Sequence, residues 1–337
     1  MEAAAPRAQE TFGSVVRRIG HTVFGKPGSV RRPLAFLIVA IIISSFVSSD
    51  FLKPSNLLAL LTSTSFLVML AVGESFVMLV GMIDLGVESV MEAAGMFVAY
   101  LYVFDHYNSI VAMVIGMLFG LGVGALVGFM VTLFRIPSFI VTLGTYWGMA
   151  GVALLFNGGN YINPDSVHPA RPFVFGGIAQ TSFGVSHLIW IALGAVVIGQ
   201  LVISFTPLGT WIKAAGSDEE AARSVGIRTN LIKILVFMIS GFLAVMAGIM
   251  ITAWESSIYP NTGQGYSLQA IAAVILGGIP FKGGRGTIVG AAIGAIVIGI
   301  ISDLIVLVGL PALYEYIFVA IILVLAGLQA RGGPFVK

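Results

Sequence analysis

Five acidic residues stand within or beside long apolar stretches of this 337-residue sequence: Glu74, Asp84, Glu88, Glu92 and Asp303. Carboxylates in such surroundings either have a structural partner or mark a polar path through the apolar region. Asp84 could cap the helix predicted after it, and this structural role is the favoured one. Glu74 and Asp303 lie deeper and could accept hydrogen bonds from the hydroxyl groups of a polyol.

Glu88 and Glu92 are four residues apart and therefore share one face of a helix. They could line a water-exposed gate near the inner mouth of a path, and a pairing with Lys282 or Arg285 is as good an alternative. Three aromatic residues complete the path candidates: Phe139, Tyr146 and Trp147. Their rings could stack on a sugar ring, although packing in the core is the favoured interpretation.

No catalytic constellation accompanies these residues. Cysteine is absent, and the four histidines are scattered along the sequence. The segment 20–26 has the spacing of a phosphate-binding loop, but Pro27 stands where the Mg²⁺-binding Ser or Thr belongs. The sequence therefore predicts no catalytic site, no metal site and no cofactor bound by this chain.

The most charged stretch after the N-terminus is an inner loop at residues 207–230. Asp218 is a good helix N-cap, and Glu219 and Glu220 then fall in the first turn, where the helix dipole favours anions. The residues that follow favour a helix interior, and Gly226 suits its C-terminal stop. The pattern predicts a short helix between two apolar segments, either docked in a groove of another protein or simply solvated.

Composition decides what kind of element positions these groups. Hydrophobic residues make up 58% of the chain and charged residues only 9%, against about a quarter in a soluble domain. The mean hydropathy is +1.03. These values exclude a soluble enzyme, a disordered chain and a nucleic-acid binder with a basic surface. They predict an all-α integral membrane protein, because the apolar stretches are long enough for helices.

Ten apolar segments meet or approach the length needed to cross a bilayer: 34–49, 55–82, 88–104, 110–134, 139–156, 186–206, 231–253, 267–280, 286–308 and 312–328. The second is too long and contains polar residues, so we expect a bend or break in it. With both termini cytoplasmic, every Lys and Arg except Lys53 and Arg171 falls on the inner side. This asymmetry favours ten transmembrane helices in that orientation.

The remaining organisation follows from these segments. We expect a basic cytoplasmic tail at 1–33, either disordered or lying on the membrane as an interfacial helix. A transmembrane domain then covers 34–330, with an outer loop at 157–185 and the inner loop at 207–230, before a cytoplasmic tail at 331–337. Glycines recur every four residues in two segments, which favours close helix packing within the subunit. These are Gly116, Gly120, Gly124 and Gly128, and Gly286, Gly290 and Gly294.

Two short glycine turns, 81–89 and 277–286, look alike and would both lie on the cytoplasmic side. They are compatible with a trace of an internal repeat, as in transporters whose halves are related by symmetry.

The inner loop resembles the EAA-type coupling motif of ATP-binding-cassette (ABC) importer permeases, in the monosaccharide branch that includes the ribose type. The matching residues of that loop are Gly216, Asp218, Glu219, Ala221, Arg223, Gly226 and Ile227, and Glu220 beside them is a further candidate for coupling to the ATPase. Further family-like stretches follow in the same order, around Ile83–Leu85, Arg135–Thr145, Gly265–Gly278 and Gly283–Gly286. The resemblance therefore extends over most of the chain.

This resemblance implies a permease subunit that moves a monosaccharide or related small polyol from a periplasmic binding protein into the cytoplasm. It further implies partner ATPase subunits that hold ATP and Mg²⁺ and dock on the inner loop. A second permease copy or paralogue would share the bacterial inner membrane with it. The chain itself would carry no catalytic site and contact lipid but no nucleic acid.

The chain also departs from the family pattern near the path. Glu88 stands where the family usually has Gly, and Ser267 replaces a common Glu. These changes leave the identity of the sugar open. The alternative function is a self-sufficient secondary transporter or channel for a small polar solute, which would need no ATPase and gives no reason for the charged inner loop.

Overall fold

The computed structural model describes residues 30–166 and 175–330. Each of the ten apolar segments contains a helix. The ten are α2 (Arg31–Val47), α3 (Pro54–Leu79), α4 (Val87–Val103), α5 (Ser109–Leu133), α6 (Ser138–Leu155), α8 (His187–Phe205), α11 (Thr229–Glu255), α12 (Tyr266–Leu276), α13 (Ile288–Leu307) and α14 (Tyr314–Ala330). Six of them are long and apolar enough to cross a membrane by themselves: α3, α5, α6, α8, α11 and α13. The fold is therefore an all-α membrane protein.

Short elements connect these helices. The described part of the outer loop contains a 3₁₀ turn (Pro164–Ser166), α7 (Phe175–Ile178) and a hairpin of β1 (Thr181–Ser182) and β2 (Val185–Ser186). The inner loop contains α9 (Pro207–Ser217) and α10 (Glu219–Ser224). The interfacial helix considered for the N-terminal tail falls on residues before 30, and the tail 331–337 also lies outside the described residues.

The expected bend or break in segment 55–82 is wrong, because α3 is one helix of 26 residues. Its polar side chains do not interrupt the backbone. The hydroxyls of Ser65 and Ser75 donate to the carbonyls of Leu61 and Ala71, at 2.7 and 2.6 Å, within the helix itself. A hydroxyl bonded to its own preceding turn needs no water, so it can lie in an apolar helix.

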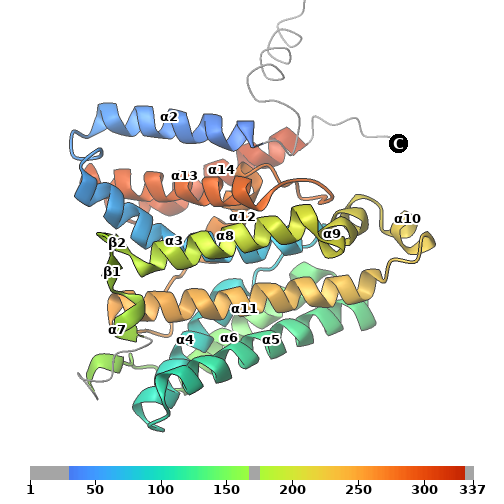
Figure 1. Cartoon of the computed structure of the whole chain (residues 1–337), viewed down its shortest axis with the longest axis horizontal. Coiled ribbons are helices and arrows are strands. Elements are labelled where there is room, and N and C mark those ends of the chain that lie inside the picture. The colour runs from blue at the N-terminus through green and yellow to red at the C-terminus, as the bar shows by residue number, and fades with distance from the viewer. Residues whose placement is uncertain (1–29, 167–174, 331–337) are drawn as a thin grey trace, which may run out of the picture.

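The core forms around α3 and α11, which are the two most buried long helices. In Figure 1, α4, α5 and α6 lie on one side of α11, while α13, α14 and α2 lie on the far side of α3. The inner loop projects beyond the bundle at one end of these helices. This end is called the α10 end below, and the end that carries α7 and the hairpin is called the opposite end.

The glycine repeats are packing sites within the subunit, as the sequence predicts. A Cβ at Gly120 would meet the carbonyl of Gly241 on α11, and one at Gly124 would overlap the carbonyl of Phe237. On α13, a Cβ at Gly294 would overlap the carbonyl of Ala273 on α12. Backbones therefore touch at these crossings, which is how small residues hold helices together in lipid.

This packing predicts unequal costs for two neighbouring glycines on α5. Gly124→Ala forces a methyl group against the backbone of α11 and should destabilise the fold by about 1–3 kcal/mol. Gly122→Ala is the matched control, because nothing lies within 4 Å of a Cβ at that position. The midpoint of thermal unfolding in detergent, measured for each purified variant, reports the loss of stability. Equal midpoints for the two variants would contradict the packing described here.

Candidate functional site

The inner loop folds as two helices rather than the single helix predicted. The additional helix, α9, follows α8 directly. The Thr206 hydroxyl accepts a hydrogen bond from the amide of Gly209 at 3.3 Å, and Pro207 occupies the first helical position. A capping Thr followed by Pro is a common helix start, so this signal was present in the sequence.

Helix α10 has both ends closed by the residues the sequence predicts. The Asp218 carboxylate accepts a hydrogen bond from the amide of Ala221 at 3.0 Å. At the other end Gly226 has φ of +88°, and its amide donates to the carbonyl of Arg223 at 3.0 Å. The amide of Ile227 donates to the carbonyl of Ala222 at 3.1 Å. This pair of bonds is the Schellman stop, which needs a residue tolerant of positive φ.

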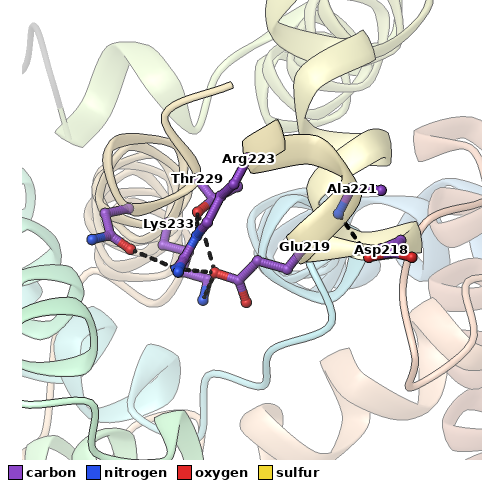
Figure 2. A network of polar contacts seen from close by, with 7 residues as sticks. Asp218, Glu219, Ala221, Arg223, Thr229 and Lys233 are labelled. Atoms are coloured by element: carbon purple, nitrogen blue, oxygen red, sulfur yellow. Dashed lines mark hydrogen bonds and ion pairs between the residues drawn. The ribbon is translucent and has the colours of Figure 1, made fainter. Parts of the chain in front are cut away.

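A network of charged groups fastens α10 to the start of α11 (Figure 2). One Glu219 carboxylate oxygen accepts from Arg223 at 2.6 Å, from Lys233 at 2.7 Å and from the Thr229 hydroxyl at 3.2 Å. Arg223 also donates to the Thr229 hydroxyl at 2.7 Å. Glu219 and Arg223 are therefore engaged within the chain, whereas the neighbouring side chains of Asp218 and Glu220 are exposed.

The last turn of α9 lies against the end of α3 and the glycine turn before α13. A Cβ at Gly216 would overlap the carbonyl oxygen of Leu79 and would lie 2.7 Å from the amide of Gly284. That amide donates to the same Leu79 carbonyl at 2.8 Å. The Ser217 hydroxyl donates to the Gly284 carbonyl at 3.4 Å. We call this backbone contact of Leu79, Gly216 and Gly284 the glycine joint.

The joint brings together the two glycine turns that the sequence singled out. A Cβ at Gly283 would lie 2.5 Å from the amide of Gly81, and one at Gly81 would lie 3.0 Å from the Lys282 carbonyl. Gly81, Gly283 and Gly284 all have positive φ, at 81°, 74° and 77°. The two turns therefore meet through main-chain atoms at the α10 end.

Two of the predicted path carboxylates form a buried cluster beside the joint. The Glu74 carboxylate accepts from the amide of Asp84 at 3.2 Å, and Asp84 accepts from the Ser240 hydroxyl at 2.8 Å. Asp84 also accepts from the amide of Gly86 at 2.9 Å, so it fixes the turn before α4 rather than capping the first turn of α4 itself. The second Glu74 oxygen is buried without a hydrogen-bond partner among the described residues.

Glu88 binds the start of α12 rather than Lys282 or Arg285. Its carboxylate accepts from the amide of Ser267 at 2.9 Å, and the amide of Glu88 donates to the Ser267 hydroxyl at 3.2 Å. Each residue thus satisfies a free amide at the N-terminus of the other's helix. No feature of the sequence pairs these two residues, which are 179 positions apart.

Glu92 does not lie at the inner mouth. It lines a cleft of about 260 Å³ together with Pro260, Asn261 and Gln264, which belong to the connection after the far end of α11. Since α11 runs away from the α10 end, this cleft opens toward the opposite end of the bundle.

The aromatic candidates and Asp303 lie elsewhere. Phe139 and Trp147 on α6 are 50% and 70% exposed, so the interpretation of core packing is wrong for them. Tyr146 lines the same cleft as Glu92. Asp303 accepts a hydrogen bond from Asn56 at 2.8 Å. Asn56 and Glu74 are separated by about 27 Å along α3, so the structure does not bring Asp303 and Glu74 together.

In the described parts of the chain, no group of three or more His, Asp or Glu side chains could hold a metal ion. A bundle of membrane-crossing helices with a capped, charged loop at one end defines a multi-pass helical membrane protein. The chain belongs to the family described as branched-chain amino acid transport system / permease component, which matches residues 56–327. It is a multi-pass protein of the bacterial inner membrane.

Relatives share nearly the whole length of the chain. The ribose import permease protein RbsC of Escherichia coli K12 is 36% identical over 296 residues, which cover 88% of this chain and 92% of that protein. RbsC of Bacillus subtilis is 31% identical, with 89% and 92% covered. The autoinducer 2 import system permease protein LsrC of Escherichia coli O9:H4 is 32% identical, with 89% and 85% covered.

A solved structure supports the fold alone. It is described as a metal-chelate type ABC transporter in an inward-facing conformation, with a TM-score of 0.52 and 16% identity. The alignment covers 90% of this chain and all of that chain.

The Glu219 network predicts a pH-dependent attachment of α10. Burial raises the pKa of Glu219, but the hydrogen bond and charge of Lys233 and the charge of Arg223 outweigh it and hold the pKa below its ordinary value. The attachment is therefore complete at neutral pH and is lost as the pH falls through that lowered pKa.

Glu219→Gln should loosen α10 at pH 7 by about 1 kcal/mol, because Glu219 and Arg223 are partly exposed and water screens their charges. Amide hydrogen exchange over 219–229 then becomes roughly fivefold faster. Glu220→Gln is the control, since Glu220 is exposed and belongs to the same turn. The network would have no such role if the two variants exchanged at the same rate.

Proposed function

We propose that this chain is the permease of an ABC importer that moves a monosaccharide or related small polyol from a periplasmic binding protein into the cytoplasm. The observation that carries this proposal is the similarity to ribose import permeases over more than nine-tenths of their length. ATP and Mg²⁺ are held by the partner ATPase subunits, and this chain contributes no catalytic site and binds no cofactor. The particular sugar is left open, because an autoinducer 2 permease is nearly as similar.

Ten transmembrane helices with both termini in the cytoplasm fit this function. Support comes from the helix found in each of the ten apolar segments and from the basic residues, which gather on one side in that arrangement. The α10 end is then cytoplasmic, where the ATPases are. The cleft beside Glu92 faces the periplasm, where the sugar is delivered.

The inner loop is the surface on which the ATPases dock. Support comes from the exposed side chains of Asp218 and Glu220 on a helix whose two ends are fixed. Movement of α10 passes through α9 to the glycine joint. Because backbone atoms already touch there, α9 cannot shift without moving Leu79 and Gly284. Leu79 ends α3, one of the two most buried long helices, so the joint passes the movement of the inner loop to the centre of the bundle.

A second permease copy completes the path along α6. Only 17% of the most apolar window of this helix is buried within the chain. Nothing lies within 4 Å of a Cβ at Gly144, Gly148 or Gly151, so a neighbouring helix could approach closely there. Phe139 and Trp147 are exposed on the same helix. The path then runs between two copies, with Tyr146 near its periplasmic end.

Substitution of Gly226 distinguishes between two functions, an ATP-driven importer and a self-sufficient secondary transporter. Gly226→Trp places a bulky side chain on the docking surface at a position with positive φ. Sugar uptake driven by ATP in vesicles that contain the partner subunits should fall roughly tenfold or more, which corresponds to about 1.4 kcal/mol or more of docking energy. Gly226→Asn is the control, since Asn tolerates this backbone conformation and is small.

Unchanged uptake in the folded Gly226→Trp complex would show that the inner loop does not couple the ATPase to transport. Uptake by the wild-type permease in vesicles without any ATPase would instead favour the secondary transporter.

A further inference from the structure

The cleft at the opposite end of the bundle contains an acidic side chain whose acceptors are unused. Glu92 is only 4% exposed, yet among the described residues its carboxylate has no hydrogen-bond or ion-pair partner. The other buried carboxylates differ. Glu88 and Asp84 are hydrogen-bonded to backbone and hydroxyl donors, and the unpartnered oxygen of Glu74 is sealed within the core.

A carboxylate that is almost wholly removed from water and has no partner in the chain is costly unless hydrogen-bond donors reach it from the open side of the cleft. Of the described residues that line the cleft, Glu92 is the only one with a formal charge. The absence of Lys and Arg from that lining disfavours a phosphorylated or carboxylated solute, which Glu92 would repel. A solute that is neutral or cationic can supply these donors in place of water.

The polar neighbours of Glu92 favour hydroxyl groups over a cation. Asn261, Gln264 and Tyr146 line the same cleft, and each of these side chains can both donate and accept a hydrogen bond. A hydroxyl group also does both, whereas an ammonium group only donates. Two neighbouring hydroxyls on one sugar ring match the two oxygens of a carboxylate, and the Tyr146 ring offers an apolar surface for the ring carbons.

The surrounding structure holds this arrangement in place. Glu92 stands one helical turn after Glu88, whose contact with Ser267 fixes α4 against α12. Ile162 and Ile258 form a two-way backbone bridge at 3.0 and 2.9 Å, which joins the loops on either side of the cleft. The Tyr316 hydroxyl donates to the carbonyl of Gln264 at 3.2 Å. The cleft is thus a preformed site and not a gap between unconnected loops.

We infer that Glu92 is a substrate-binding residue, which accepts hydrogen bonds from two adjacent hydroxyls of the sugar as it enters from the periplasmic side. This inference rests on the proposed function. The cleft of about 260 Å³ is open on one side, as an entry site requires.

The test uses the complete complex of permease, ATPase and binding protein in proteoliposomes, with radiolabelled D-ribose and its 2-deoxy and 3-deoxy analogues as probes. Glu92→Ala should reduce D-ribose uptake roughly tenfold or more, the effect of losing a charge-assisted hydrogen bond. Glu92→Gln keeps the shape of the side chain and should give a smaller loss. Glu255→Gln is the control, since Glu255 is exposed near the same end and does not line the cleft.

A second readout separates binding from a structural role. The wild-type complex should discriminate between D-ribose and at least one deoxy analogue more strongly than the Glu92→Ala complex does. Because the binding protein is the same in both complexes, any change in that ratio arises in the permease. ATP hydrolysis stimulated by the binding protein should stay within about twofold of wild type, since the α10 end is untouched.

Three results would overturn the inference in distinguishable ways. Transport of no sugar by the wild-type complex refutes the proposed function and the inference with it. Wild-type sugar uptake with unchanged rates and ratios in both Glu92 variants refutes the inference alone. A wild-type preference for D-glucosamine over D-glucose that disappears in Glu92→Gln, with D-ribose uptake unchanged, assigns the cleft to a cation instead of a polyol.

Discussion

Main-chain contact at the glycine joint determines how the two ends of this protein are connected. The Leu79 carbonyl accepts a hydrogen bond from the amide of Gly284. The last turn of α9 packs against both residues, so closely that a Cβ at Gly216 would overlap the Leu79 carbonyl. Side chains between helices can change rotamer and absorb small shifts, but touching backbones cannot. The joint therefore behaves as a rigid link between the inner loop, α3 and the turn before α13. The glycine crossings of α5 with α11 and of α12 with α13 extend the same rigidity into the bundle.

The buried polar groups differ in role along the bundle: most bind the backbone of the chain itself, and one lines a cleft. Glu74 accepts a hydrogen bond from the Asp84 amide, and Asp84 accepts from the Ser240 hydroxyl and from the Gly86 amide, so these carboxylates hold the turn before α4. At the interface of α4 and α12, Glu88 and Ser267 close each other's helix start. Among the buried carboxylates of the described residues, Glu92, which lies farther along α4, lines an open cleft. The side chains best placed to meet a solute are thus at the end opposite α10. If ATPases dock on α10, as proposed above, the two ends must be linked mechanically.

The sequence predicts what depends on local spacing. Hydropathy locates the ten helical segments, and the types of Asp218 and Gly226 predict both ends of α10, because capping involves residues close in the chain. The sequence does not predict contacts between residues that are far apart in the chain. The contact of Glu88 with Ser267 and the location of Glu92 follow from tertiary packing. The hydroxyls of α3 predict a break, but they bond within the helix and leave it continuous. Thr206 and Pro207 have the residue types of a helix start, so a second helix in the inner loop is compatible with local sequence.

The most direct measurement of this linkage is the amount of sugar taken up per ATP hydrolysed by a Gly216→Ala permease in the complete complex. Gly122→Ala, at a position with open space around it, is the reference variant. If the joint carries the movement of α10 to the path, Gly216→Ala continues to hydrolyse ATP but takes up far less sugar per ATP than the reference. An unchanged ratio in a folded Gly216→Ala complex would contradict the role of the glycine joint.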